Sequence, residues 1–126
     1  MIKQVIVMRK DLNMRKGKMV AQGAHASMKV FFNRMYRIND KGYATDFSKE
    51  MEEWMESSFT KIVLGVDSEQ EILELGEKAR ENCIPFAIIT DNGTTEFNGV
   101  KTITCIAIGP EEESKVNEIT GNLNLL

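Results

Sequence analysis

Three side chains that could act on a substrate fall on one face of a predicted helix. Lys18 and Gln22 are four residues apart, and His25 follows three residues later. Residues at these spacings share a helix face, with Cβ atoms roughly 5–6 Å apart. The face would offer an ammonium group, an amide that donates and accepts, and an imidazole, a combination that suits a polar binding or catalytic site. The plainer alternatives are a solvated Lys, a solvated Gln and a hydrogen-bonded structural histidine.

A carboxylate is the second candidate for chemistry. Asp91 directly follows the apolar run at residues 86–90, which predicts a strand. At the carboxyl end of a strand, a carboxylate can act as a base or orient a water molecule. The alternative is a turn, because an Asn-Gly dipeptide comes next. Thr95 and Thr102 would fit strands without any special role.

Positive charge gathers in the first third of the chain. Residues 1–41 carry ten Lys or Arg against two Asp, a net charge of +8, whereas residues 42–126 carry −11. Arg15, Lys16 and Lys18 lie where the predicted helix begins, and the free N–H groups of a helix start attract anions. The asymmetry indicates a face that binds a polyanion, or else a solvated basic helix. Neither Gly-rich phosphate-loop pattern occurs, which disfavours P-loop nucleotide hydrolysis.

The elements that must position these side chains alternate between strands and helices. Strands are predicted at residues 2–8, 61–66, 86–90 and 101–108, and a long helix at 16–37 is followed by a turn at 39–43. An apolar stripe of Phe47, Met51, Trp54 and Met55 predicts a second helix. Ser68 opens a third helix with a capping-box pattern, and Pro110 starts a fourth that ends at residues 120–121.

This order predicts an α/β fold in a single domain, residues 1–126. Because no helix separates the last two strands, we expect a three-layer α/β/α domain with a mixed four-stranded sheet. In the last strand Ile103, Cys105 and Ala107 alternate with Thr102, Thr104 and Ile106, so the two sets should lie on opposite faces.

Composition excludes several classes of protein. One histidine excludes His-rich metal sites, and two cysteines 22 positions apart predict reduced thiols in a cytoplasmic protein rather than a disulfide framework. Apolar runs are too short for a membrane span, and the N-terminus lacks the pattern of a signal peptide. We therefore expect no membrane association.

Several motifs resemble the peptidyl-tRNA hydrolase 2 family. Residues 5–26 read VIVMRKDLNMRKGKMVAQGAHA, similar to the family pattern of a strand, R-x-D-L-x-M and G-K-x-x-A-Q-x-x-H-A. Matches continue through Trp54, residues 61–64, Thr-Asp-x-Gly-x-Thr at 90–95, Thr102, residues 108–110 and residues 119–125. They therefore cover nearly the whole chain in the family's order.

The resemblance implies a mixed α/β/α fold, usually dimeric, and an esterase that cuts the peptide from the 3′-terminal ribose of tRNA. It implies neither a metal nor an organic cofactor. The catalytic positions carried over are Lys18, Gln22, Asp91 and Thr95, and the positions expected to bind substrate are Arg9, Lys10, Arg15, Lys16, His25 and Thr102. The cations would hold the acceptor stem and 3′ end of peptidyl-tRNA. The expected partners are thus this RNA and a second copy of the chain, a homodimer.

The chemistry leaves roles open among the four catalytic candidates. Asp91 could orient or deprotonate the attacking water. Lys18, with Gln22 or Thr95, could stabilise the oxyanion, and Lys18 could equally hold the terminal phosphate.

The chain departs from the family pattern after Asp91. Asn92, Glu96 and Phe97 replace Ala, Gln and Ile, the proline before Gly99 is missing, and the loop is a residue shorter. The stretch between His25 and Trp54 is also longer than usual. These departures motivate one alternative, a family relative that binds RNA or protein without turnover. Another alternative is an esterase for a different acylated substrate.

Overall fold

The core of the protein is a five-stranded mixed sheet with the order β5-β6-β1-β4-β7. The structure, a computed structural model, describes residues 1–94 and 96–126. The strands are β1 (Ile2–Arg9), β4 (Lys61–Val66), β5 (Phe86–Asp91), β6 (Thr102–Glu112) and β7 (Asn124–Leu125). β1 and β4 run parallel, and the other neighbours are antiparallel. The mixed sheet is as predicted, but the four-stranded count was wrong because the short C-terminal strand β7 pairs with β4.

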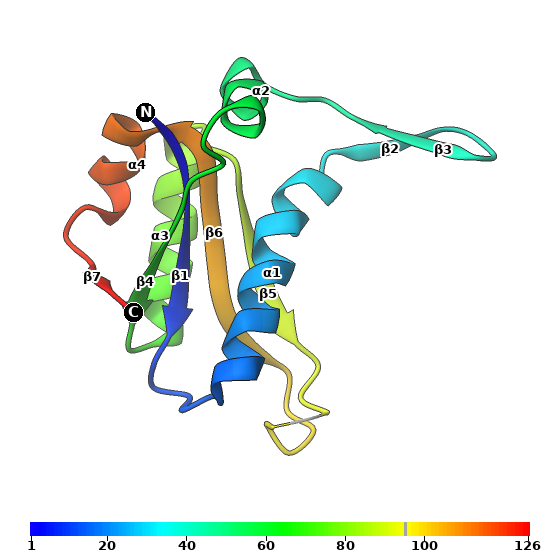
Figure 1. The fold of residues 1–126 in the computed structure, drawn as a ribbon. Coiled ribbons are helices and arrows are strands. Elements are labelled where there is room, and N and C mark those ends of the chain that lie inside the picture. The colour runs from blue at the N-terminus through cyan, green and yellow to red at the C-terminus, as the bar shows by residue number, and fades with distance from the viewer. Residues whose placement is uncertain (95) are drawn as a thin grey trace.

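Helices cover both faces of this sheet (Figure 1). On one face α1 (Lys16–Phe32) and α2 (Lys49–Glu56) pack over a cluster that includes Ala26, Val30 and Met51. On the other face α3 (Glu69–Glu81) and α4 (Glu113–Thr120) pack over a second cluster. β1 lies between the two clusters, which explains its nearly continuous apolar sequence.

The predicted long helix ends early, at Phe32. The chain then forms a separate hairpin of β2 (Met35–Asn39) and β3 (Gly42–Thr45), which projects away from the body in Figure 1. Asn33 caps the helix and Lys29 lies in its last turn, which are weak stop signals that the prediction of a longer helix did not use, and residues 33–37 contain neither Gly nor Pro. Thr45 fixes the hairpin to the helix end by donating its hydroxyl to the Phe31 carbonyl (3.1 Å). The turn predicted at residues 39–43 is confirmed, inside this hairpin.

The last helix also differs from its prediction. Pro110 lies within β6, which continues to Glu112 and pairs with the start of β1, so α4 begins only at Glu113. Earlier boundaries agree better: Ser68 accepts from the Glu71 N–H (3.2 Å) at the start of α3, as the capping pattern predicts.

Other local expectations have mixed outcomes. Met51 and Trp54 of the predicted stripe are buried, but Phe47 precedes α2 and Met55 is exposed. Both cysteines are free thiols, and burial raises the pKa of Cys105 to about 11. Within residues 1–94 and 96–126, every helix is too short or too polar to cross a bilayer.

Candidate active site

Lys18, Gln22 and Asp91 meet where α1 begins and β5 ends. Lys18 Nζ donates to Asp91 Oδ1 (2.7 Å), and Gln22 Nε2 donates to the same oxygen (3.2 Å). The other carboxylate oxygen accepts the backbone N–H of Gly93 (2.8 Å). The Lys18 and Asp91 side chains are only 14% and 10% exposed, so the ion pair is largely desolvated. The helix spacing predicted that Lys18 and Gln22 share a face, and the family resemblance implied that Asp91, far away in sequence, belongs to the same site.

Hydrogen bonding keeps the Asp91 carboxylate ionised. The bond from Lys18 lowers the pKa of Asp91 most, burial opposes it, and the Gly93 N–H, the Lys18 charge and Gln22 lower the pKa further. A carboxylate with a lowered pKa is a weak base at neutral pH but a strong hydrogen-bond acceptor. This favours orientation of a water molecule over full proton abstraction.

Thr104 is a site residue that the sequence analysis missed. Its hydroxyl is fully buried and donates to Gln22 Oε1, while Gln22 is itself 2% exposed. The amide oxygen of Gln22 is thereby occupied, which turns the amide NH₂ toward Asp91. Thr104 therefore fixes which end of the amide the site presents.

A β-bulge in β6 explains why Thr104 was missed. The pairing steps from Ile89 opposite Cys105 to Thr90 opposite Ile103, so Thr104 is an extra residue. A bulge breaks the strict alternation of side chains along a strand. Thr104 and Cys105 both contact Gln22, whereas Ile103 packs with the cluster under α3. The predicted separation of 103, 105 and 107 from 102, 104 and 106 is therefore wrong at the bulge.

The other residues expected near the cluster lie at different distances along the chain from Asp91 and Gln22. Thr102 lies directly opposite Asp91 in the β5–β6 ladder and donates its hydroxyl to the Val100 carbonyl (2.9 Å). His25 is exposed one turn beyond Gln22 on α1. Thr95, the fourth expected catalytic residue, lies outside the described residues.

The four expected cationic contacts are spread around the cluster rather than gathered into it. Arg9 is bound to Asp11 through two nitrogens and to the Ile103 carbonyl. Lys10 lies 3.6 Å from Asp67, on the β4 side. Lys16 lies on the opposite flank of α1 from Lys18, where it lines another cavity.

Two residues that differ from the family pattern, Glu96 and Phe97, contact residues at the start of α1. Glu96 accepts from Arg15 Nε (2.9 Å), so its negative charge is balanced while the Arg15 side chain stays 84% exposed. Phe97 packs with the α1-side cluster, and Lys18 Nζ lies 5.7 Å from the centre of its ring. The altered loop therefore contributes a wall beside the cluster.

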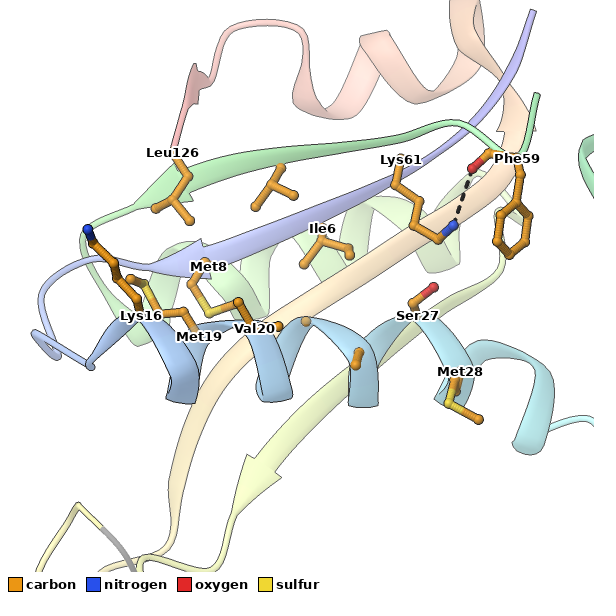
Figure 2. A pocket seen from close by; sticks show the side chains of 13 residues that line it. Ile6, Met8, Lys16, Met19, Val20, Ser27, Met28, Phe59, Lys61 and Leu126 are labelled. Carbon is orange, nitrogen blue, oxygen red and sulfur yellow. Dashed lines mark hydrogen bonds between the residues drawn. The ribbon is translucent and has the colours of Figure 1, made fainter.

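Two cavities flank α1. The first, of about 500 Å³, adjoins the cluster and lies between α1 and the end of β5; His25, Met28, Lys29, Phe32 and residues 88–90 line it. The second is an apolar groove of about 780 Å³ between the other flank of α1 and strands β1 and β4 (Figure 2). Figure 2 shows Ile6 and Met8 from β1 across the groove from α1, with Lys61 and Phe59 at one end and Lys16 at the other.

The cluster can polarise a carbonyl group and hold a water molecule. Across the described ranges, 1–94 and 96–126, no three His, Cys, Asp or Glu side chains are grouped to hold a metal ion. Positive charge at the site comes from the Lys18 ammonium, which can stabilise an oxyanion directly. Fold and cluster together define a layered α/β protein with a polar site suited to hydrolysis of an acyl bond.

Comparison with known proteins identifies the family. The family model described as "Peptidyl-tRNA hydrolase PTH2" matches residues 2–126. This chain belongs to the peptidyl-tRNA hydrolase PTH2 family, whose members are hydrolases acting on ester bonds.

Archaeal relatives match over their full length. Proteins named peptidyl-tRNA hydrolase are 41% identical over 125 residues in Methanocaldococcus jannaschii and 42% identical over 125 residues in Nanoarchaeum equitans. The alignments cover 99% of this chain and 100% and 99% of those proteins. A solved structure of a protein of unknown function from Agrobacterium tumefaciens shares the fold, with a TM-score of 0.56 at 11% identity, covering 98% of this chain and 96% of that one.

Proposed function

We propose that this protein hydrolyses the ester between a peptide, or an N-blocked amino acid, and the 3′-terminal ribose of tRNA, and so recycles peptidyl-tRNA. The convergence of Lys18, Gln22 and Asp91 at 2.7 and 3.2 Å carries the proposal, together with family membership. An ester needs an oriented water and a donor for the carbonyl oxygen, and this cluster supplies both.

Asp91 is proposed to hold the attacking water. Its carboxylate accepts a hydrogen bond from the water and so directs the water oxygen at the ester carbonyl, while one water proton goes to the ribose oxygen as the carbon–oxygen bond breaks. The lowered pKa of Asp91 supports this role, because the carboxylate stays ionised and is a strong hydrogen-bond acceptor throughout the step. The products are a free peptide carboxylate, a tRNA 3′ hydroxyl and a proton released to the solvent.

Lys18 and Gln22 are proposed to stabilise the developing oxyanion. An ammonium group has three N–H donors, so Lys18 can bond Asp91 and still reach the carbonyl oxygen. Gln22 adds an amide donor fixed in direction by Thr104. Thr95 is proposed as a further donor on the family resemblance alone.

The tRNA is proposed to approach at the start of α1. The mostly exposed Arg15 guanidinium and the α1 N-terminus offer contacts to phosphate, as His25 and Thr102 would to the 3′-terminal nucleotide. Lys10 and Arg9 would add charge around this contact, and Lys16 would do so from the end of the groove on the other flank of α1. Binding of this kind follows the RNA backbone and weakens with salt.

The apolar groove of Figure 2 is proposed as the contact surface of a homodimer. Val20, Met28 and Val63 expose 73%, 53% and 36% of their surface there, an apolar patch of a kind that favours association. A two-fold dimer would bring two identical grooves together. Light scattering, which gives the molar mass in solution, tests this on the wild type and Val20→Glu. A dimeric wild type and a monomeric variant support the proposal, and an equal mass for both contradicts it.

A cytoplasmic location is proposed as well. Both cysteines are free, as is usual in reducing compartments, and peptidyl-tRNA arises during translation. Fractionation of cells tests it directly.

Release of tRNA from an N-acetylaminoacyl-tRNA tests the proposed reaction. We expect turnover by the wild type and loss in Asp91→Ala without loss of folding. Tight RNA binding with no turnover by the wild type would instead identify an RNA-binding family relative. Hydrolysis of simple acyl esters but not of acylated tRNA would identify a different esterase.

A further inference from the structure

β5 is an open edge of the sheet, and it ends in the candidate active site. β5 is the terminal strand in the order β5-β6-β1-β4-β7, and Asp91 is its last residue. Its only neighbour among the described strands is β6. An open edge has unpaired backbone N–H and C=O groups and can accept another extended chain.

The backbone register shows which groups face outward. The Gly109 N–H donates to the Pro85 carbonyl (2.8 Å), and the pairs 87–107 and 89–105 follow at intervals of two. In an antiparallel ladder such alternate pairs exchange hydrogen bonds, and the residues between them turn their backbone groups away. Phe86, Ile88 and Thr90 therefore present N–H and C=O groups to the outer side of β5.

The cavity of about 500 Å³ lies along this edge. Ile88 lines the cavity, but its side chain packs on the other face of the sheet, against Gly76 of α3. The part of Ile88 that borders the cavity is therefore its main chain. The facing wall comes from the α1 flank that carries Lys18 and Gln22, with Met28 and the half-exposed Phe32. The cavity thus begins at Thr90, the residue before Asp91, and at His25, one turn beyond Gln22, and it has both polar backbone and apolar walls.

We propose that the peptide arm of the substrate binds here as an added strand, parallel to β5, with its side chains between β5 and Phe32. The proposal rests on the proposed function. The ester carbonyl must sit beside Asp91, so the peptide must leave the site in some direction, and β5 offers three outward residues leading back from that point. Main-chain pairing would accept peptides of any sequence, as a substrate class with variable peptides requires.

RNA is the weaker candidate for this cavity. Phosphate oxygens only accept hydrogen bonds, so they would meet the outward C=O groups of β5 as acceptor against acceptor. A peptide backbone alternates donors and acceptors at about 3.3 Å per residue, the spacing of a parallel strand. Lys29, which also lines the cavity, can donate to a peptide carbonyl group.

Peptide length is the first test, measured as kcat/KM of the full chain on tRNAs carrying N-acetylaminoacyl, dipeptidyl, tripeptidyl and pentapeptidyl groups. Filling the edge up to Ile88 takes about three residues at this rise. We expect kcat/KM to increase by about tenfold from the acetylated amino acid to the tripeptide and then to level off. A flat profile with active enzyme overturns the added strand but leaves the proposed hydrolysis standing, whereas failure to cleave any of these substrates overturns both.

N-methylation of single peptide amides gives the second test and needs no protein variant. In a parallel strand only every other residue turns its N–H toward β5, so sensitivity should alternate along the peptide. We expect about fivefold loss at alternate amides, the typical effect of one hydrogen bond. Equal sensitivity at all amides, or none, overturns the proposal.

Phe32→Ala, with Leu73→Ala as control, separates peptide from RNA. Leu73 is an exposed leucine on α3, on the opposite face of the sheet. We expect Phe32→Ala to slow the tripeptidyl substrate several-fold more than the acetylated amino acid, and Leu73→Ala to slow neither. Equal slowing of all substrates together with an altered salt dependence would place RNA in the cavity and contradict the peptide arm.

Discussion

Replacing Lys18 by alanine should slow hydrolysis by about 10²–10³-fold in a protein that still folds. The substitution removes an ammonium 2.7 Å from Asp91 Oδ1, in a pair whose side chains are 14% and 10% exposed. Gln22 and the Gly93 N–H still donate to Asp91, so the carboxylate keeps two of its partners. Loss of one hydrogen bond to a charged group costs about 2 kcal/mol. For a chain of this size, the melting temperature would fall by about 6–10 °C.

The rate effect of Lys18→Ala follows from the loss of an oxyanion donor. Such a loss typically slows the chemical step by about 10²–10³-fold. The assay is single-turnover hydrolysis of a saturating N-acetylaminoacyl-tRNA well below the melting temperature, with Lys115→Ala on α4 as an exposed control. An increase in KM with an unchanged rate at saturation, found by varying the substrate concentration, would assign Lys18 to the terminal phosphate. A rate within threefold of the wild type, in a folded variant, would refute its role at the carbonyl.

Four further outcomes follow. Because the folded-state pKa of Asp91 is lowered, its stabilising effect is present above the unfolded pKa of about 4 and is lost as the pH falls from there through the folded-state pKa. The difference in melting temperature between the wild type and Asp91→Asn should therefore shrink as the pH falls below about 4. A constant difference would contradict the ion pair. Thr104→Val keeps the shape but removes the hydroxyl bonded to Gln22, so single-turnover rates should fall by about tenfold, and the buried amide oxygen left unpaired should cost about 1–3 kcal/mol of stability. An unchanged rate in the folded variant would show that Gln22 needs no such orientation. Glu96→Gln frees Arg15, so filter binding should show tighter tRNA binding with a steeper salt dependence, and weaker binding would contradict the RNA contact. Chelator should leave turnover unchanged, because Lys18 supplies the charge at the carbonyl, and loss of activity would contradict this role.

The sequence predicted the parts of the site that depend on local rules. The helix spacing placed Lys18 and Gln22 on one face, and the apolar run at residues 86–90 placed Asp91 at a strand end. The meeting of the two elements also needs β5 to run in the same direction as β1, two strands away, and this followed from the family resemblance rather than from local patterns.

The sequence could not predict features that arise from pairing between distant segments. The bulge at Thr104 exists only relative to Ile89 and Thr90 on the neighbouring strand. The end of α1 depends on a hairpin that Thr45 holds to the Phe31 carbonyl, and β6 runs past Pro110 because β1 pairs with it. The open edge of β5 likewise follows from strand order, which residue patterns along the chain do not encode.

A double-substitution cycle tests most directly whether Lys18 and Asp91 act on the same bond. Single-turnover hydrolysis of N-acetylaminoacyl-tRNA would be measured for the wild type, Lys18→Ala, Asp91→Ala and the double variant. Groups that act as a unit show non-additive losses, so the double variant should be about as slow as the slower single variant. Losses that multiply in the double variant would mean that the two groups act independently, and would contradict a shared catalytic cluster.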